Sequence, residues 1–376
     1  MSKVLLVANT DWYLFNFRLS LAQSLKERGY EVVMVSPRGP YISEFGRIGC
    51  RWTEWEVNRQ IGWPWKELES LRRLARIYRM EKPDFIHLHT LKAVLYGSVA
   101  RWFAGQPILI NSIAGRGHVY SSRSPVFILA SHAMNRFIQL IDRTSAPIWI
   151  FENQLDLEYF RARNLIARGK SYLIESVGLD LNKFPALPEP TGTPTVLYAG
   201  RMLQSKGVGL LVEAVRLLKS QGFEFNCILV GEPDKGSYDS IEEKTLLEWN
   251  KEGLVNWVGW QKETAAWYQR ANLVVFPTRY GEGVPTVLLE AAASGRAIVA
   301  TDHPGCSAIV KDGKNGLLIP KDDVPTLANA IARLLADPGL RHQMGLAGRA
   351  MIESQFSNTL INELTFSVYE SAELSD

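Results

Sequence analysis

The sequence predicts an α/β protein with two doubly wound parallel sheets, because strand and helix patterns alternate in two separate series. Short apolar runs alternate with helical patterns over residues 1–185. The Pro-rich stretch FPALPEPTGTP, residues 184–194, interrupts this alternation, which then restarts. A chain of 376 residues is also too long for one ordinary domain of about 100–200 residues. We therefore expect domains at 1–185 and 195–356, with a helix at 357–376 that packs back onto the first domain.

The elements expected in the first domain follow from local patterns. Apolar runs rich in β-branched residues predict buried strands at residues 3–9, 31–36, 84–89, 107–113, 146–151 and 171–178. Helical periodicity predicts helices at residues 17–28, 91–103, 125–141 and 155–168. This order of strands and helices is typical of a parallel sheet that is covered on both faces.

The second domain repeats the pattern. Strands are expected at residues 195–200, 225–231, 254–260, 272–277 and 297–302. Helices are expected at residues 206–220 and 241–251, and a further Ala- and Leu-rich helix opens at Pro285. Two such domains form a cleft between the carboxyl ends of their strands, where doubly wound folds bind ligands.

Composition excludes several classes of protein. No apolar run reaches the roughly 18 residues that a membrane-spanning helix needs, and the acidic Asp11 follows the apolar start too soon for a signal peptide. The three cysteines, Cys50, Cys227 and Cys306, show no metal-ligand spacing, which argues against a zinc site or a disulfide framework. We expect a cytoplasmic protein without a transmembrane anchor.

The charge is unevenly distributed along the chain. Residues 1–185 hold 25 Lys and Arg against 16 Asp and Glu, a net charge of +9, whereas residues 186–376 carry −6. The basic half includes the Trp-rich stretch at 51–66 and a helical pattern in which Leu68 is expected on the apolar stripe and Leu74 at its edge. Such a surface suits an anionic membrane or a phosphate-bearing acceptor. An ordinary amphipathic helix with a solvated charged face is the alternative.

The first β-α turn of the second domain, YAGRMLQSKG, carries two cations. Arg201 follows the strand and Lys206 precedes the helix. Free N–H groups and the dipole at a helix N-terminus attract anions, and a guanidinium with an ammonium adds positive charge. The turn therefore suits a diphosphate held without a metal. Two ordinary surface cations are the alternative.

A later strand-to-helix loop, YGEGVP, carries two carboxylates eight residues apart. Its glycines allow backbone N–H groups to approach a ligand, and Glu282 can accept hydrogen bonds from hydroxyl groups. Glu290 lies inside the following helix among Leu and Ala, where a carboxylate needs a polar partner. A ribose diol is a suitable partner.

Taken in order, these motifs resemble a known family. GR-x4-KG, EG-x-P-x4-E, ATDHPGCSAIV and DGKNGLLIP are similar to the retaining glycosyltransferases of family 4, the glycosyl transferases group 1, which have the GT-B fold of two Rossmann-like domains facing across a cleft. The first half, with ANTDWYLFNF, EVNRQ, IAGRGHVY and VGLDLNKF, resembles a subgroup that builds bacterial polysaccharides and O-antigens, often on undecaprenyl-diphosphate acceptors.

The resemblance implies a donor site in the second domain and an acceptor site in the first. Arg201 and Lys206 neutralise the departing diphosphate, Glu282 contacts the donor sugar, and Glu290 holds the ribose. The other implied nucleotide-sugar contacts are Gly283, Val284, Thr286, Gly231 and Gln261, with the base near Val258–Gln261. In the first domain the aromatic NTDWYLFNF replaces a glycine-rich loop of many relatives, so acceptor recognition differs. The acceptor candidates are Asp11, Arg18, His89, Arg116 and His118.

Three departures from the family pattern bear on these roles. His118 is displaced from the usual place of a cleft histidine, and Thr286 stands where an Arg often follows the proline. Ser307 and Ala308 replace a charged pair, and such changes affect donor preference. His89 shares a strand face with His87, and this face belongs either to the core or to the cleft.

The implied reaction is transfer of a hexosyl or N-acetylhexosaminyl group with retention, without a metal or a cofactor. A UDP-sugar is the favoured donor, and a glycan or a polyprenyl-diphosphate-linked glycan is the acceptor. The acceptor hydroxyl attacks on the face that the diphosphate leaves, since no positioned protein nucleophile is evident. The expected location is the cytoplasm, with peripheral contact at the inner membrane face. A catalytically silent nucleotide-sugar binder and a GT-B-type UDP-sugar 2-epimerase are the alternatives; no nucleic-acid reader motif is present.

Overall fold

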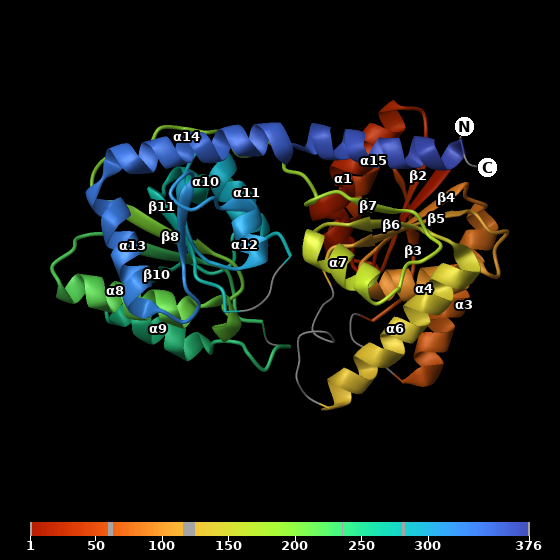
Figure 1. The fold of residues 1–376 in the computed structure, drawn as a ribbon, viewed down its shortest axis with the longest axis horizontal. Coiled ribbons are helices and arrows are strands. Elements are labelled where there is room, and N and C mark those ends of the chain that lie inside the picture. The colour runs from red at the N-terminus through yellow and green to blue at the C-terminus, as the bar shows by residue number, and fades with distance from the viewer. Residues whose placement is uncertain (1, 59–62, 116–124, 235, 280–282, 375–376) are drawn as a thin grey trace. The chain divides into compact units, whose positions relative to one another are not determined.

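The computed structural model describes residues 2–58, 63–115, 125–234, 236–279 and 283–374. The chain forms two compact units, each with its own parallel sheet and covering helices (Figure 1). The first unit comprises Met1–Gly178 and Asn358–Asp376, and the second comprises Leu179–Ser357. The predicted fold class, two doubly wound α/β units, is confirmed.

The described strands of the first unit form a parallel sheet in the order β3-β2-β1-β4-β5-β6-β7. Their bounds are β1 Lys3–Val7, β2 Glu31–Ser36, β3 Arg51–Glu54, β4 Phe85–His89, β5 Ile108–Ile113, β6 Ile148–Phe151 and β7 Ser171–Leu173. All but β3 lie within predicted runs. The sequence of β3, RWTE, is charged and only part-buried because this strand lies at the edge of the sheet, so it has no apolar run.

Helices cover both faces of this sheet (Figure 1). One face carries α1 Asp11–Glu27, α2 Ile42–Arg47 and α15 Asn358–Glu373, and the other carries α3 Pro64–Glu81, α4 Leu91–Arg101, α6 Pro125–Ser145 and α7 Gln154–Ala162. The C-terminal helix α15 packs against α1, where the Asn362 side-chain amide donates to the hydroxyls of Ser20 and Ser24, each at 3.0 Å.

Helix α1 begins at Asp11, so the predicted start at Phe17 is wrong. Thr10 caps the helix by accepting a hydrogen bond from the Tyr13 N–H at 3.2 Å. Asp11 in the first turn suits the positive end of the helix. The aromatic stretch that replaces the family's loop is therefore helical, and its side chains are fixed relative to the sheet.

Helix α3 buries most of the predicted stripe, with Leu68 as the exception. Leu74, Ala75 and Tyr78 are buried, whereas Leu68 is 46% exposed. In the first turn Glu67 accepts a hydrogen bond from Tyr96 and pairs with Lys92, both on α4, whereas the side chain of Leu68 stays exposed. The expectation that Leu68 lies on the buried stripe is wrong, because the buried side of the helix begins only at Ser70.

The described strands of the second unit form a parallel sheet in the order β10-β9-β8-β11-β12-β13. Their bounds are β8 Thr195–Ala199, β9 Asn226–Val230, β10 Asn256–Trp257, β11 Leu273–Phe276, β12 Ala297–Thr301 and β13 Gly316–Ile319. Each of the first five lies inside a predicted strand. No strand was predicted at β13, whose four residues follow directly on a turn and are too short to stand out.

The helices of this unit are η1 Gln204–Lys206, α8 Val208–Ser220, α9 Glu243–Lys251, α10 Ala265–Gln269, α11 Thr286–Ala293, α12 Pro304–Ile309, α13 Val324–Ala336 and α14 Pro338–Gln355. Helix α8 packs against α13, and α11 packs against α14 (Figure 1). Their apolar faces join both sides of the sheet in one core.

Cys50, Cys227 and Cys306 are buried, free thiols. Within the described ranges, none of the helices combines the length and the apolar character that crossing a membrane requires.

Candidate active site

Both sheets have one position where the strand order reverses, and doubly wound folds bind ligands beside this position. In the second unit it lies between β8 and β11, which are neighbours in the sheet but far apart in the sequence. The turn with Arg201 follows β8, and the loop toward Glu290 follows β11. The two segments that sequence analysis singled out therefore lie on adjacent strands at the switch point.

The turn after β8 is tighter than the predicted helix start at Lys206. Residues Gln204–Lys206 form a 3₁₀ turn, and α8 begins only at Val208. Between them Gly207 has a φ of 76°, and a Cβ placed on it would lie 1.9 Å from the carbonyl oxygen of Pro277. Only glycine fits here, because the turn touches the backbone after β11.

Hydrogen bonds join this turn to the loop after β11. The carbonyl oxygen of Ser205 accepts from the backbone N–H of Arg279 at 2.7 Å and from the Thr278 hydroxyl at 3.4 Å. The ammonium of Lys206 lies 5.5 Å from the centre of the Phe276 ring. Lys206 is thus held beside the chain segment that leads to Glu282, which itself lies outside the described residues.

Arg201 occupies the exposed part of the same turn. Its Nη1 lies 2.7 Å from a carboxylate oxygen of Asp234, and its side chain is 53% exposed. An exposed ion pair of this kind contributes little to stability, so the guanidinium can exchange its partner for a ligand at small cost. Sequence analysis did not single out Asp234, because Arg201 and Asp234 follow two different strands, β8 and β9, which become neighbours only in the folded sheet.

The loop after β11 resumes at Gly283 and Val284 and leads into α11. Pro285 is the N-cap residue, with φ of −69° and ψ of 122°, and it supplies no side-chain hydrogen bond. Thr286 is the first residue of the helix, whose leading backbone N–H groups point toward the loop. These positions can contribute N–H donors to a phosphate or a sugar hydroxyl.

Glu290 lies within α11 and is half-buried. Burial raises the pKa of its carboxyl to about 7, and the hydroxyl groups of Tyr268 and Thr264 oppose this rise. Tyr268 is itself fully buried, and its hydroxyl has no hydrogen bond of ordinary geometry within the described residues. The carboxylate and this hydroxyl form a polar pair in an apolar core. Tyr268, from α10, was not predicted as a site residue, since only the fold places it beside Glu290.

A pocket of about 410 Å³ lies at the ends of β9 and β10, next to Gly231. Among the described residues, its lining includes Trp257, Gly259, Glu232 and Ser240. Gly231 has a φ of 134°, its N–H donates to the Gly259 carbonyl at 2.8 Å, and its own carbonyl accepts from the Trp257 indole at 2.7 Å. The pocket is therefore built on fixed backbone.

Gln261, the other candidate near this pocket, is occupied elsewhere. Its side-chain amide donates to the carbonyl of Val258 at 2.9 Å, and it is not among the described lining residues. The side-chain amide of Gln261 therefore stabilises the turn at Val258–Gln261, and the residue of this turn that lines the pocket is Gly259.

The acceptor candidates of the first unit gather at its own switch point, between β1 and β4. Asp11 follows β1, is buried, and accepts from the backbone N–H of Tyr41 at 2.9 Å. This bond ties the loop after β2 to the start of α1. Arg116 and His118 lie outside the described residues.

Arg18 and His89 are in direct contact in the interior of the first unit. The guanidinium Nε donates to His89 Nδ1 at 2.9 Å, and Nη2 donates to the Tyr13 hydroxyl at 3.0 Å. The same guanidinium forms a buried ion pair with Glu152, which follows β6. Glu152 gave no signal in the sequence, because 134 residues separate it from Arg18.

Both strand histidines are buried on the covered side of the sheet, and the core alternative holds for His87, whose two ring nitrogens are both bonded. His87 is bonded to the Ser112 hydroxyl at 2.7 Å and to the Tyr369 hydroxyl of α15 at 2.9 Å. Burial keeps the pKa of both imidazoles well below its usual range. His89 nevertheless ends the strand at the switch point.

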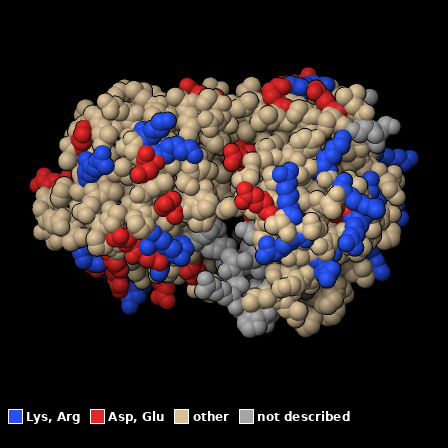
Figure 2. Space-filling model, in the orientation of Figure 1, with Lys and Arg blue, Asp and Glu red and all other residues tan. Residues whose placement is uncertain are grey.

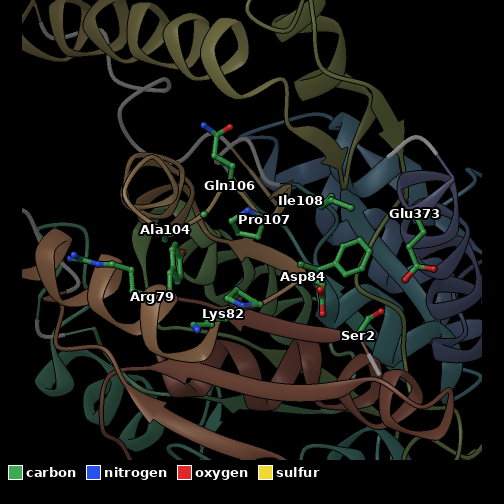
Figure 3. A pocket seen from close by; sticks show the side chains of 13 residues that line it. Ser2, Arg79, Lys82, Asp84, Ala104, Gln106, Pro107, Ile108 and Glu373 are labelled. Atoms are coloured by element: carbon green, nitrogen blue, oxygen red, sulfur yellow. The ribbon is translucent and has the colours of Figure 1, made fainter.

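A separate cavity of the first unit lies at the opposite edge of its sheet. It has a volume of about 730 Å³ and lies at the amino ends of β4 and β5, where Lys82, Asp84 and Gln106 line it (Figure 3). Ligands of doubly wound folds bind at the carboxyl ends of the strands, so this cavity is not the predicted site. No group of three or more His, Cys, Asp or Glu suited to a metal ion occurs within the residues described.

Two parallel sheets, each with the reversed 3-2-1-4 strand order, agree with the two Rossmann-like domains of a GT-B-type glycosyltransferase that the motifs resemble. A family model described as "Glycosyl transferases group 1" matches residues 193–337, and one described as "Glycosyl transferase 4-like" matches residues 3–144. The chain belongs to this glycosyltransferase family, as the resemblance of its motifs indicated.

Curated relatives and solved structures agree with this assignment. The N,N'-diacetylbacillosaminyl-diphospho-undecaprenol alpha-1,3-N-acetylgalactosaminyltransferase of Campylobacter jejuni is 27% identical, with 95% of both chains covered. The UDP-Gal:alpha-D-GlcNAc-diphosphoundecaprenol alpha-1,3-galactosyltransferase of Escherichia coli is 23% identical over 72% of this chain and 71% of its own. The fold is similar to that of Anabaena HepE in complex with UDP and glucose, with a TM-score of 0.79, 18% identity, and 99% and 100% of the two chains covered.

Proposed function

We propose that the protein transfers a hexosyl or N-acetylhexosaminyl group, with retention, from a nucleoside-diphosphate sugar to a glycan or lipid-linked acceptor in bacterial cell-surface polysaccharide synthesis. The observation that carries this proposal is the junction of the turn after β8 with the loop after β11, through the Ser205 carbonyl. It holds Lys206 beside the segment that leads to Glu282. The names of the Campylobacter and Escherichia relatives, which act on undecaprenyl-linked glycans, support this class of acceptor.

In this proposal the leaving diphosphate is stabilised by Arg201 and Lys206. Charge builds up on the β-phosphate as the glycosidic bond breaks, so fixed cations there lower the barrier directly. Loss of one such contact costs about two to three orders of magnitude in rate. Because both charges come from side chains, transfer is expected to continue when divalent metals are chelated.

The remaining donor contacts of this proposal are those that the motifs of the second unit imply. Glu282 binds hydroxyls of the transferred sugar, and Glu290 accepts from the ribose diol. The backbone N–H groups of Gly283 and Val284, before α11, and of Thr286, its first residue, add hydrogen bonds to phosphate or sugar. The pocket beside Gly231 is the place for the base, and the UDP in the name of the Escherichia relative makes uracil the favoured base.

The first experiment is a panel of UDP-, GDP- and ADP-sugars, with thermal shift and nucleotide release as readouts. A shift with a UDP-sugar and release of UDP with a polyprenyl-diphosphate glycan are expected. Proton NMR of the product reports whether the anomeric configuration is kept, and activity in excess EDTA reports metal independence. Binding without turnover in folded protein would favour a silent binder, and release of free 2-epimerised sugar would favour an epimerase.

Glu282→Ala tests the sugar contact. Transfer is expected to fall by at least about two orders of magnitude. The melting temperature should stay unchanged, because the sequence pattern predicts Glu282 in a strand-to-helix loop and not in the core. Glu263→Ala, which removes a carboxylate elsewhere on the surface of the same unit, is the matched control. A folded, fully active Glu282→Ala protein would exclude Glu282 from the site.

A lipid-linked acceptor also requires contact with a membrane, and the first unit offers a surface for it. Trp63 and Trp65, at the start of α3, stack on each other at 5.0 Å and are 65% and 62% exposed. Lys66, Arg72 and Arg76 on the same helix are exposed cations. Basic side chains predominate on the face of this unit shown below α15 in Figure 2. Exposed indoles beside cations match the interface of an anionic bilayer on the cytoplasmic side.

Vesicle flotation tests this contact. The protein is expected to bind vesicles that contain phosphatidylglycerol at low salt, and to bind phosphatidylcholine vesicles weakly. Trp63→Ala with Trp65→Ala should reduce binding, whereas Phe103→Ala, which removes an exposed aromatic side chain beyond the end of α4, should not. The proposed membrane contact would be refuted if the Trp63→Ala/Trp65→Ala protein bound vesicles as well as the Phe103→Ala protein, or if the wild type did not bind anionic vesicles.

A further inference from the structure

Four side chains from separate parts of the first unit meet at its switch point. Arg18 and Tyr13 come from α1, His89 ends β4, and Glu152 follows β6. All of the polar nitrogens of Arg18 that face this cluster are used: Nε donates to His89 Nδ1, and Nη2 contacts Tyr13 and Glu152. The arrangement fixes the hydrogen-bonding state of His89.

A guanidinium can only donate hydrogen bonds, so Nδ1 of His89 must accept. Burial, then His87 and Arg18, hold the pKa of His89 well below its usual range, so the ring is neutral at physiological pH. A neutral imidazole with an accepting Nδ1 carries its hydrogen on Nε2. The cluster therefore presents an N–H group at Nε2.

This Nε2–H has no partner within the described residues, although His89 is fully buried. The next residue, Thr90, is in the same condition: its hydroxyl is buried and makes no hydrogen bond there. Thr90 has a φ of 75°, rare for a β-branched residue, and as N-cap of α4 it makes no side-chain cap bond. Two adjacent unpaired polar groups on strained backbone are unusual unless a ligand satisfies them.

The net charge around the His89 Nε2–H group and the Thr90 hydroxyl limits the chemical class of ligand that they can bind. The guanidinium of Arg18 is neutralised by Glu152, and His89 is uncharged, so the cluster has no net charge. Neutral donors without excess positive charge suit a neutral oxygen rather than a phosphate. The turn after β8 in the second unit differs in this respect, because it carries two cations, Arg201 and Lys206, and therefore suits a phosphate.

We propose that His89 Nε2–H and the Thr90 hydroxyl bind a neutral oxygen of the acceptor's sugar, a hydroxyl or an amide carbonyl, and that Glu152 is a positioning residue that acts through Arg18. This inference rests on the proposed glycosyl transfer, and it assigns the acceptor sugar to the carboxyl end of β4. The diphosphate of a lipid-linked acceptor lies elsewhere.

NMR of the ¹⁵N-labelled histidines tests the hydrogen-bonding state directly, with His89→Gln used to assign the signal. The Nε2–H tautomer is expected in the free protein, and its signal should shift with methyl N-acetylglucosaminide but not with inorganic diphosphate. The Nδ1–H tautomer, or a response to diphosphate alone, would overturn the proposal.

Two variants separate recognition from structure. His89→Asn places an amide oxygen near the Nδ1 position and keeps an acceptor for Arg18, but leaves nothing at the Nε2 position. His89→Gln reaches the Nε2 position with an N–H group. Binding of the methyl glycoside is expected to weaken about tenfold or more in the Asn variant and to stay within about threefold in the Gln variant. A purely structural histidine predicts the reverse order or equal losses.

Thr90→Val and Glu152→Gln complete the test. Thr90→Val keeps the shape and removes the hydroxyl, so it should weaken glycoside binding without lowering the melting temperature. Glu152→Gln should weaken glycoside binding while leaving UDP-sugar binding unchanged. Wild-type protein that binds a UDP-sugar but whose His89 signal ignores the glycoside would refute this inference alone. Protein that binds no nucleotide sugar would refute the proposed function itself.

Discussion

Nucleotide-sugar affinity is expected to depend on the ionisation of Glu290. Its pKa of about 7 means that the carboxyl is about 10% ionised at pH 6 and about 90% ionised at pH 8. A ribose diol donates hydrogen bonds, so it binds the carboxylate and not the protonated acid. The affinity for a UDP-sugar should therefore rise about tenfold from pH 6 to pH 8. Binding at pH 6 should release close to one proton.

Isothermal titration calorimetry in buffers of different ionisation enthalpy measures both quantities. A UDP-sugar is a better probe than UDP, because its diphosphate is a diester with no group that titrates in this range. The matched variant is Glu290→Gln, which keeps the shape of the side chain and cannot ionise. It should bind weakly at every pH and release no proton. A pH-independent affinity in the wild type, or an equal slope in the variant, would refute the ribose role.

The free protein should show the opposite dependence on pH. The pKa of Glu290 is raised on folding, from an ordinary 4.5 to about 7, so this carboxyl favours the folded state most below pH 4.5. That contribution is lost as the pH rises through 7. The Glu290→Gln protein should therefore gain stability relative to the wild type between pH 5 and pH 8, by at most about 3 kcal/mol. Chemical denaturation at the two pH values measures the difference.

Two further substitutions test the turn after β8. Lys206→Ala should weaken UDP binding by roughly tenfold to a hundredfold and uridine binding little, because a charged hydrogen bond to phosphate is lost; equal losses for both ligands would argue against a phosphate contact. Gly207→Ala should lower stability by about 1–3 kcal/mol or more, since its φ is 76° and the new Cβ would meet the Pro277 carbonyl at 1.9 Å. Gly209→Ala, with its nearest neighbour at 3.5 Å inside α8, is the control and should not destabilise.

The fold class and most strands could be predicted because their causes are local. A buried parallel strand needs a continuous apolar run, and such runs are visible in the sequence. The strands that had no prediction, β3 and β13, are short, and both lie at an edge of their sheet. The start of α1 was missed because aromatic residues were interpreted as a loop, whereas the cap at Thr10 places them in the helix.

The site was predictable in part, for the same physical reason. Arg201, Lys206 and Glu290 stand in short motifs whose spacing shows the turn or helix that carries them. The residues that contact them do not stand in such motifs. Asp234 contacts Arg201 only because β8 and β9 are neighbouring strands. Tyr268 lies beside Glu290 only because α10 packs beside α11. Strand order and helix packing are tertiary properties, so a single sequence gives no direct signal for such pairs.

The two units share one topology, but the charges at their switch points differ. In each, the strand order reverses beside the first strand, between β1 and β4 or between β8 and β11, and polar side chains meet at the carboxyl ends there. In the second unit the cations stand at the surface of the turn, where Arg201 keeps an exposed and exchangeable partner. In the first unit the only cation of the cluster is buried and neutralised by Glu152. A buried, compensated charge orders its neighbours but cannot attract an anion, whereas an exposed one can. This difference supports our proposal that the second unit binds the diphosphate and the first unit binds the uncharged sugar.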